Sequence, residues 1–182
     1  MLVIADGGNW IDPLLERTFH GYVRILDYYH ASEHLWDVAG AVYDGNEAKR
    51  KRYGEKLESW LWNGETRKLL KEMALQSQRL GPPPAEASSA DPRQVVATNL
   101  QYFTSREDQM DYPTYRGKGW PIGSGQVEAS VKQFNKRIKG TEQFWKEESL
   151  EPILALRGMW LSQDGRWDRY WATRPAYARK AA

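Results

Sequence analysis

The chain has 182 residues, with 26 Lys and Arg against 24 Asp and Glu, three His and no Cys. This length suits one domain with a hydrophobic core, and the 41% of hydrophobic residues exclude a disordered chain. The absence of Cys excludes a disulfide scaffold, a thiol nucleophile, a zinc finger and an iron–sulfur cluster. No apolar run approaches the roughly 20 residues that cross a bilayer, so we expect no membrane partner.

Charge is unevenly distributed along the chain. Residues 1–125 hold 15 basic and 17 acidic side chains, whereas residues 126–182 hold 11 basic and 7 acidic ones. An acidic first part and a basic last part suit a protein that holds a metal ion in one region and phosphates in another. The nine Trp and ten Tyr suit core packing, and they also suit platforms on which nucleic-acid bases stack.

The first part of the chain predicts a strand, a helix and a second strand. Residues 2–5 form a short apolar run that Asp6 ends, residues 9–19 show helical spacing, and residues 22–26 form a second run that Asp27 follows. Because this order is typical of a βαβ unit, we expect the two strands to be parallel, with an exposed edge that favours association. Functional groups in such sheets collect at the carboxyl ends of the strands.

The rest of the chain is predicted to be helical, with two interruptions. Apolar residues recur at helical spacing in five regions, which are 30–43, 47–80 (two helices separated by Gly64), 92 onward, 126–139 and 150–161. The interruptions are a Pro-rich linker at 81–90 and a loop rich in Gly and Pro at 110–125.

The predicted helix at 126–139 carries two different stripes of side chains. An apolar stripe, expected in the core, contains Val127, Val131, Phe134 and Ile138. The adjacent polar stripe contains Glu128, Lys132, Asn135 and Lys139. A carboxylate followed by Lys, Asn and Lys can hold a divalent cation at one end and contact a phosphate backbone along its length. The alternative is a surface ion pair between Glu128 and Lys132, worth only a few tenths of a kcal/mol.

Three separated segments carry acidic residues in a recognisable order. Asp6 stands in Ala5–Ile11, Asp27-x-x-His30 in Ile25–Trp36, and Glu128 at the end of Ile122–Glu128. These segments resemble bacterial insertion-sequence transposases of the DDE type, and within them the ISKra-type group. Three downstream segments fit the pattern of the same family, namely 137–140, 153–157 and 166–171.

The resemblance implies an RNase H-like catalytic core. In this α/β fold class we expect the chain to be mostly helical, with two parallel strands and a helical insertion. The implied partial catalytic core comprises residues 1–45 and 92–145, with residues 46–91 as a helical insertion and Pro-rich linker. Residues 146–182 would form a C-terminal helix and a basic, aromatic tail.

The resemblance also implies an enzyme that cuts DNA and joins its 3′ ends. Three carboxylates of the family hold two Mg²⁺ or Mn²⁺ ions. Asp6 matches the second carboxylate and Glu128 the third, whereas the first has no match, so we expect little activity from this chain alone. Asp27 and His30 match an Asp-x-x-His signature, for which we expect a structural or DNA-positioning role.

The implied partner is double-stranded DNA, both transposon ends and target. The residues expected to contact it are Lys132, Asn135, Arg137 and Lys139. A homodimer, or complementation by an N-terminal part that supplies the first Asp, is also implied, in the cytoplasm of a bacterium and at its nucleoid.

Two other functions fit the same sequence. One is a DNA-binding remnant or regulator that retains the basic last third but does no chemistry, and the other is a helical interaction protein with no role at DNA. A zinc site is a further alternative, because His30 and His34 are four residues apart, although the His-Glu-x-x-His order of metalloproteases is absent.

Overall fold

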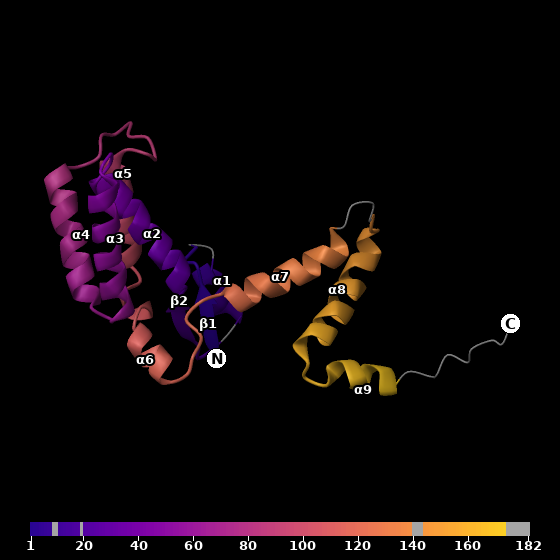
Figure 1. Cartoon of the computed structure of the whole chain (residues 1–182). Helices are drawn as coiled ribbons and strands as arrows, with labels where there is room; N and C mark the ends of the chain where they lie inside the picture. The colour runs from indigo at the N-terminus through magenta and orange to yellow at the C-terminus, as the bar shows by residue number, and fades with distance from the viewer. Residues whose placement is uncertain (9–10, 19, 140–143, 174–182) are drawn as a thin grey trace. The chain divides into compact units, whose positions relative to one another are not determined.

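The computed structural model describes residues 1–8, 11–18, 20–139 and 144–173 (Figure 1). They are mostly helical and contain two parallel strands, which confirms the predicted secondary-structure content. The chain forms two compact units, Met1–Ser124 and Gly125–Ala182. The segment at 46–91, predicted as a helical insertion and linker, belongs to the first unit.

The predicted βαβ unit is present at the start of the first unit. Strands β1 (Leu2–Ala5) and β2 (Val23–Leu26) pair in parallel, with Leu2 opposite Val23 and Ala5 opposite Leu26. Helix α1 (Ile11–Thr18) connects them, within the predicted range. Strand β2 ends in the core, since Ile25 and Leu26 are fully buried.

Four helices form the main core of the first unit. They are α2 (Tyr28–Val42), α3 (Glu47–Trp62), α4 (Thr66–Leu80) and α5 (Pro92–Thr104). Helix α2 contacts α3 and α5, and α4 contacts α3 and α5 (Figure 1). Their shared core includes Leu35, Val38, Leu57, Leu61, Leu69, Met73, Val96 and Phe103. Helices α3 and α4, expected as an insertion, thus pack into the same core because their apolar stripes bury the same interior.

Polar residues and glycine determine where these helices begin and end. The side chains of Asp27, Asn46 and Asp91 accept hydrogen bonds from the first backbone N–H groups of α2, α3 and α5. Gly64 has φ +70° in the turn between α3 and α4, a conformation that glycine adopts without strain. The predicted separation of two helices at Gly64 is confirmed.

The segment predicted as a loop at 110–125 contains a short helix, so that prediction is wrong in part. Helix α6 (Tyr112–Gly117) follows the 3-10 turn η1 (Glu107–Gln109). Asp111 caps its first turn and Pro113 lies in that turn, where a missing N–H costs no hydrogen bond. Tyr112 and Tyr115 are buried, so tertiary packing stabilises the helix.

The second unit contains three described helices, α7 (Gly125–Ile138), α8 (Glu147–Ser162) and α9 (Arg166–Ala172). Helix α8 contacts both α7 and α9, and Trp167 makes edge-to-face contacts with Trp160 and Trp171. Every described side chain of this unit is at least partly exposed. Val131, predicted in the core, is 50% exposed.

Candidate functional site

The carboxyl ends of β1 and β2 bring Asp6 and Asp27 to one edge of the sheet. Asp6 follows β1 and Asp27 follows β2, whose last residues Ala5 and Leu26 lie opposite each other. The N–H of Asp27 continues the ladder and donates to the carbonyl of Ala5 at 2.9 Å. The two side chains nevertheless have different surroundings.

The Asp6 side chain is exposed, and Tyr102 and Arg106 bind the backbone of the loop that carries it. Its Oδ1 accepts a hydrogen bond from the N–H of Gly8 at 2.9 Å, and its carbonyl accepts one from the Tyr102 hydroxyl at 2.7 Å. Gly7 has φ +85°, and a Cβ on it would lie 2.6 Å from Nε of Arg106. Arg106 donates to the Gly7 carbonyl. The loop after β1 is therefore fixed to α5 while its carboxylate remains accessible.

The Asp27 carboxylate is buried, and backbone N–H groups use both of its oxygens. Oδ1 accepts from Tyr29 at 2.9 Å and from His30 at 3.2 Å, which caps α2. Oδ2 accepts from the N–H of Ser124 at 2.6 Å. Burial alone would raise the pKa of Asp27, but the hydrogen bonds from Ser124, His30 and Tyr29 outweigh it and hold this pKa below its ordinary value.

The end of the first unit is anchored beside Asp27. The N–H of Tyr28 donates to the carbonyl of Ile122 at 2.8 Å. A Cβ on Gly123 would lie 2.6 Å from the ring of Tyr29, so the backbone of this segment packs directly on that ring. Together with the Ser124 bond, these contacts fix the segment that immediately precedes α7 in the sequence.

His30 and His34 form a chain of contacts from α2 to α5. Nδ1 of His30 lies 3.3 Å from Oε2 of Glu33, and Nε2 of His30 lies 3.3 Å from Nε2 of His34. Nδ1 of His34 lies 2.6 Å from Oδ1 of Asn99. Burial is the main cause that lowers the pKa of His34, and the neighbouring His30 adds to it.

The residues predicted to contact DNA lie on or beside α7. The side chains of Lys132 and Asn135 are exposed, and Lys139, also exposed, follows the last residue of the helix. The backbones of Glu128 and Arg137 belong to α7, whereas their side chains lie outside the described residues. Asp6 belongs to Met1–Ser124 and Glu128 to Gly125–Ala182.

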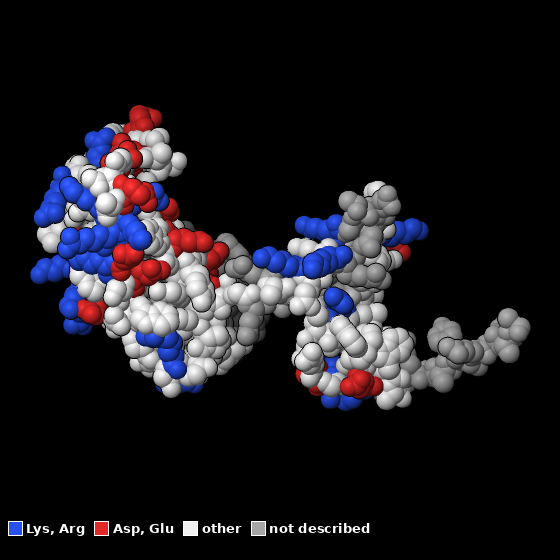
Figure 2. Space-filling view, in the orientation of Figure 1, with Lys and Arg blue, Asp and Glu red and all other residues white. Residues whose placement is uncertain are grey.

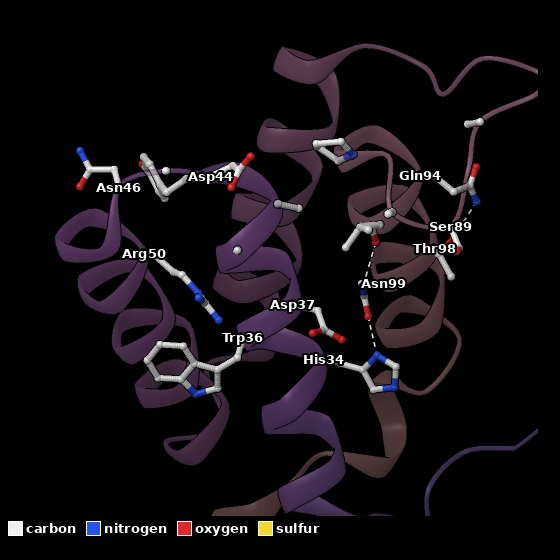
Figure 3. Close-up of a pocket in the computed structure, with 18 of the residues that line it drawn as sticks. His34, Trp36, Asp37, Asp44, Asn46, Arg50, Ser89, Gln94, Thr98 and Asn99 are labelled. Carbon is white, nitrogen blue, oxygen red and sulfur yellow. Dashed lines mark hydrogen bonds between the residues drawn. The ribbon is translucent and has the colours of Figure 1, made fainter.

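A cavity of about 1200 Å³ lies between α2, the start of α3, α5 and the segment that precedes α5 (Figure 3). Asp37, Asp44 and Arg50 are among its lining residues, and His34 and Asn99 line it from the α2–α5 contact. Asp6, the described carboxylate that is predicted to hold metal, is not among its lining residues.

Comparison with protein-family models, with curated proteins and with solved structures finds no match for this chain. In the part of the chain that the structure describes, no group of three or more His, Asp or Glu side chains could hold a metal ion. No described helix has the length and hydropathy that a membrane span requires.

Four residues that build this region bind partners that the sequence does not reveal. Tyr102 and Arg106 hold the loop after β1, Asn99 holds His34, and Ser124 binds Asp27. Tyr102 and Arg106 lie 96 and 99 residues from their partners in the loop after β1. Asn99 lies 65 residues from His34, and Ser124 lies 97 residues from Asp27. A local pattern cannot reveal such pairs, although the resemblance does draw attention to Ser124.

Proposed function

We propose that this chain is part of the catalytic domain of a DDE-type DNA transposase with an RNase H-like core. The observation that carries the proposal is the exposed Asp6 carboxylate at the carboxyl end of a parallel strand, on a loop that Tyr102 and Arg106 hold. Parallel sheets concentrate functional groups at this position. Glu128 follows the anchored Ser124 by four residues in the sequence.

Of the two Asp side chains at the sheet edge, Asp6 is the one whose oxygens could bind a hard divalent cation such as Mg²⁺. Asp6 offers an exposed carboxylate with one backbone hydrogen bond, whereas both oxygens of Asp27 accept backbone N–H groups. Asp6 and Glu128 would hold the ions, which, when bound, activate the attacking hydroxyl and stabilise the leaving oxygen. Asp27 would hold the end of the first unit in place through Ser124.

DNA binding is assigned to the basic second unit. Residues 126–182 carry a net charge of +4, and Lys and Arg side chains follow α7 in Figure 2. Lys132, Arg137 and Lys139 would neutralise phosphates, and Asn135 would donate to the same backbone.

A gel shift with random duplex DNA at low and moderate salt tests this assignment. We expect affinity to fall steeply as salt rises, because binding by lysine releases counterions from DNA. Lys132→Ala and Lys139→Ala should each reduce the slope of log affinity against log salt by about 1. Lys51→Ala removes the same charge from an exposed position in α3 and should leave the slope unchanged. A salt-independent affinity, or equal effects of all three variants, would contradict the assignment.

Metal binding separates the enzyme from a DNA-binding remnant. We expect weak Mn²⁺ binding by electron paramagnetic resonance, since two of three carboxylates are matched, and weaker binding still in Asp6→Asn and Glu128→Gln. The purified chain should nick supercoiled DNA in Mg²⁺ little or not at all. If both variants bind Mn²⁺ as the parent does while DNA binding persists, the remnant is the correct function. Robust nicking by the chain would overturn the requirement for a third carboxylate.

A further inference from the structure

The imidazole rings of His30 and His34, on the first turns of α2, approach each other through their Nε2 atoms. Nε2 of His30 and Nε2 of His34 are 3.3 Å apart, and the ring planes are nearly perpendicular at 86°. This contact lies outside the pair of carboxylates discussed above. What it can bind depends on which nitrogen of each ring carries the proton.

The proton of His34 is assigned by Asn99. The amide Nδ2 of Asn99 donates to the carbonyl of Val95 at 2.8 Å, so its Oδ1 is the atom that faces His34 (Figure 3). Because an amide oxygen can only accept, Nδ1 of His34 is the donor in the 2.6 Å contact. In the neutral ring this leaves a lone pair on Nε2.

Glu33 is the charged neighbour of His30 on the same helix. Nδ1 of His30 lies 3.3 Å from a carboxylate oxygen of Glu33, and this negative charge favours a proton on Nδ1 over one on Nε2. A neutral His30 ring with its proton on Nδ1 has its lone pair on Nε2. Two Nε2 atoms that both lack a proton would repel at their separation of 3.3 Å, and a cation bound by both would remove this repulsion.

We propose that His30 and His34 bind one divalent transition-metal ion of the Zn²⁺ class through their Nε2 atoms. Zinc–nitrogen bonds of about 2.0–2.1 Å at a tetrahedral angle separate two nitrogens by about 3.3–3.4 Å. The observed Nε2 separation of 3.3 Å agrees with this span. Metal-bound histidines almost always donate their other ring N–H to a carboxylate or carbonyl. Asn99 accepts from Nδ1 of His34 in this way, and the Glu33 carboxylate lies 3.3 Å from Nδ1 of His30.

The site is preorganised and reachable. His34 packs against the ring of Tyr102 at 4.2 Å between centroids and against Phe103, and Asn99 is buried. The His30 side chain is 39% exposed, so an ion can enter from solvent. Since no group of three acidic or His side chains assembles among the described residues, water would complete the coordination. This arrangement is open and suits exchangeable binding.

Calorimetric titration of the full chain with Zn²⁺ at neutral pH tests the proposal. We expect one ion per chain, and we expect His30→Gln and His34→Gln each to weaken binding by at least about tenfold. The matched control is His20→Gln, which removes the remaining histidine, an exposed one, and should leave affinity unchanged. Excess Mg²⁺ should not displace Zn²⁺, because imidazole is a poor ligand for Mg²⁺.

A thermal melt of each variant separates loss of ligand from loss of fold. His30→Gln changes a partly exposed side chain and should melt as the parent does, so its affinity alone decides the question if His34→Gln unfolds. Zinc affinity that His30→Gln leaves unchanged, or that His20→Gln lowers equally, overturns the proposal. A shared proton in place of a metal is then the explanation of the contact.

Discussion

Asp27 connects three parts of the first unit through one carboxylate. It follows β2, caps α2 and binds the N–H of Ser124. We expect Asp27→Ala to lower the free energy of unfolding by about 1–3 kcal/mol, because it removes a helix cap and a further charged hydrogen bond. Asp27→Asn should cost less, since its amide oxygen can still cap α2. Urea denaturation followed by circular dichroism measures both, with Asn46→Ala, another cap, as the control with a cost of about 1 kcal/mol.

The same carboxylate predicts how stability depends on pH. The pKa of Asp27 is below its ordinary value in the folded chain, so the folded state releases this proton more readily than the unfolded state. The ionised Asp27 carboxylate therefore adds to the free energy of unfolding above the unfolded pKa of about 3.9. This stabilisation is lost as pH falls through the folded pKa. The difference in free energy of unfolding between the parent and Asp27→Asn should therefore shrink as pH falls below about 4. A difference that stays constant on acidification would show that the charge of Asp27 contributes nothing.

At the level of elements, α2 and α3 pack closely because Gly54 of α3 lies against the ring of Trp36 of α2. A Cβ on Gly54 would lie 2.6–2.9 Å from three atoms of the Trp36 ring. Alanine favours a helix over glycine by up to about 1 kcal/mol, but the clash should dominate and destabilise Gly54→Ala by about 1–3 kcal/mol. Thermal unfolding measures the effect. Gly117→Ala is the control, since nothing lies within 4 Å of its Cβ and it should be neutral or stabilising.

At the level of the whole molecule, the short sheet predicts self-association. Among the described residues β1 and β2 pair only with each other, which leaves strand edges as templates for further pairing. We expect sedimentation velocity to show larger species as concentration rises. Val23→Lys should suppress them, because a charged lysine on an edge strand opposes pairing.

Leu75→Lys provides the control for this experiment. Leu75 is 42% exposed in α4 and Val23 is 40% exposed in β2, so the two variants add the same charge at equally exposed aliphatic positions. Association that both variants suppress equally would point to apolar surface in general and not to the sheet edge. A monomer at every concentration would contradict the prediction.

Much of the fold could be predicted from the sequence because its signals are local. The apolar runs before Asp6 and Asp27 predicted two parallel strands, and Gly64 predicted the turn between two helices. Helix α6 was missed because Gly and Pro dominate its segment, and in isolation such a short helix is unstable. Burial of Tyr112 and its hydrogen bond to the Leu26 carbonyl supply the missing stabilisation.

The sequence by itself determined the order of strands and helices and the position of Asp6 and Asp27 at the strand ends, since periodicity and caps act within a few residues. Only the tertiary structure decided that Asp6 stays exposed and that α3 and α4 share the main core. It also decided that the Asp27 carboxylate accepts hydrogen bonds from the N–H groups of Tyr29, His30 and Ser124. The contact of His34 with Asn99 joins residues 65 apart. Side-chain packing between distant helices selects such partners, and no local pattern encodes them.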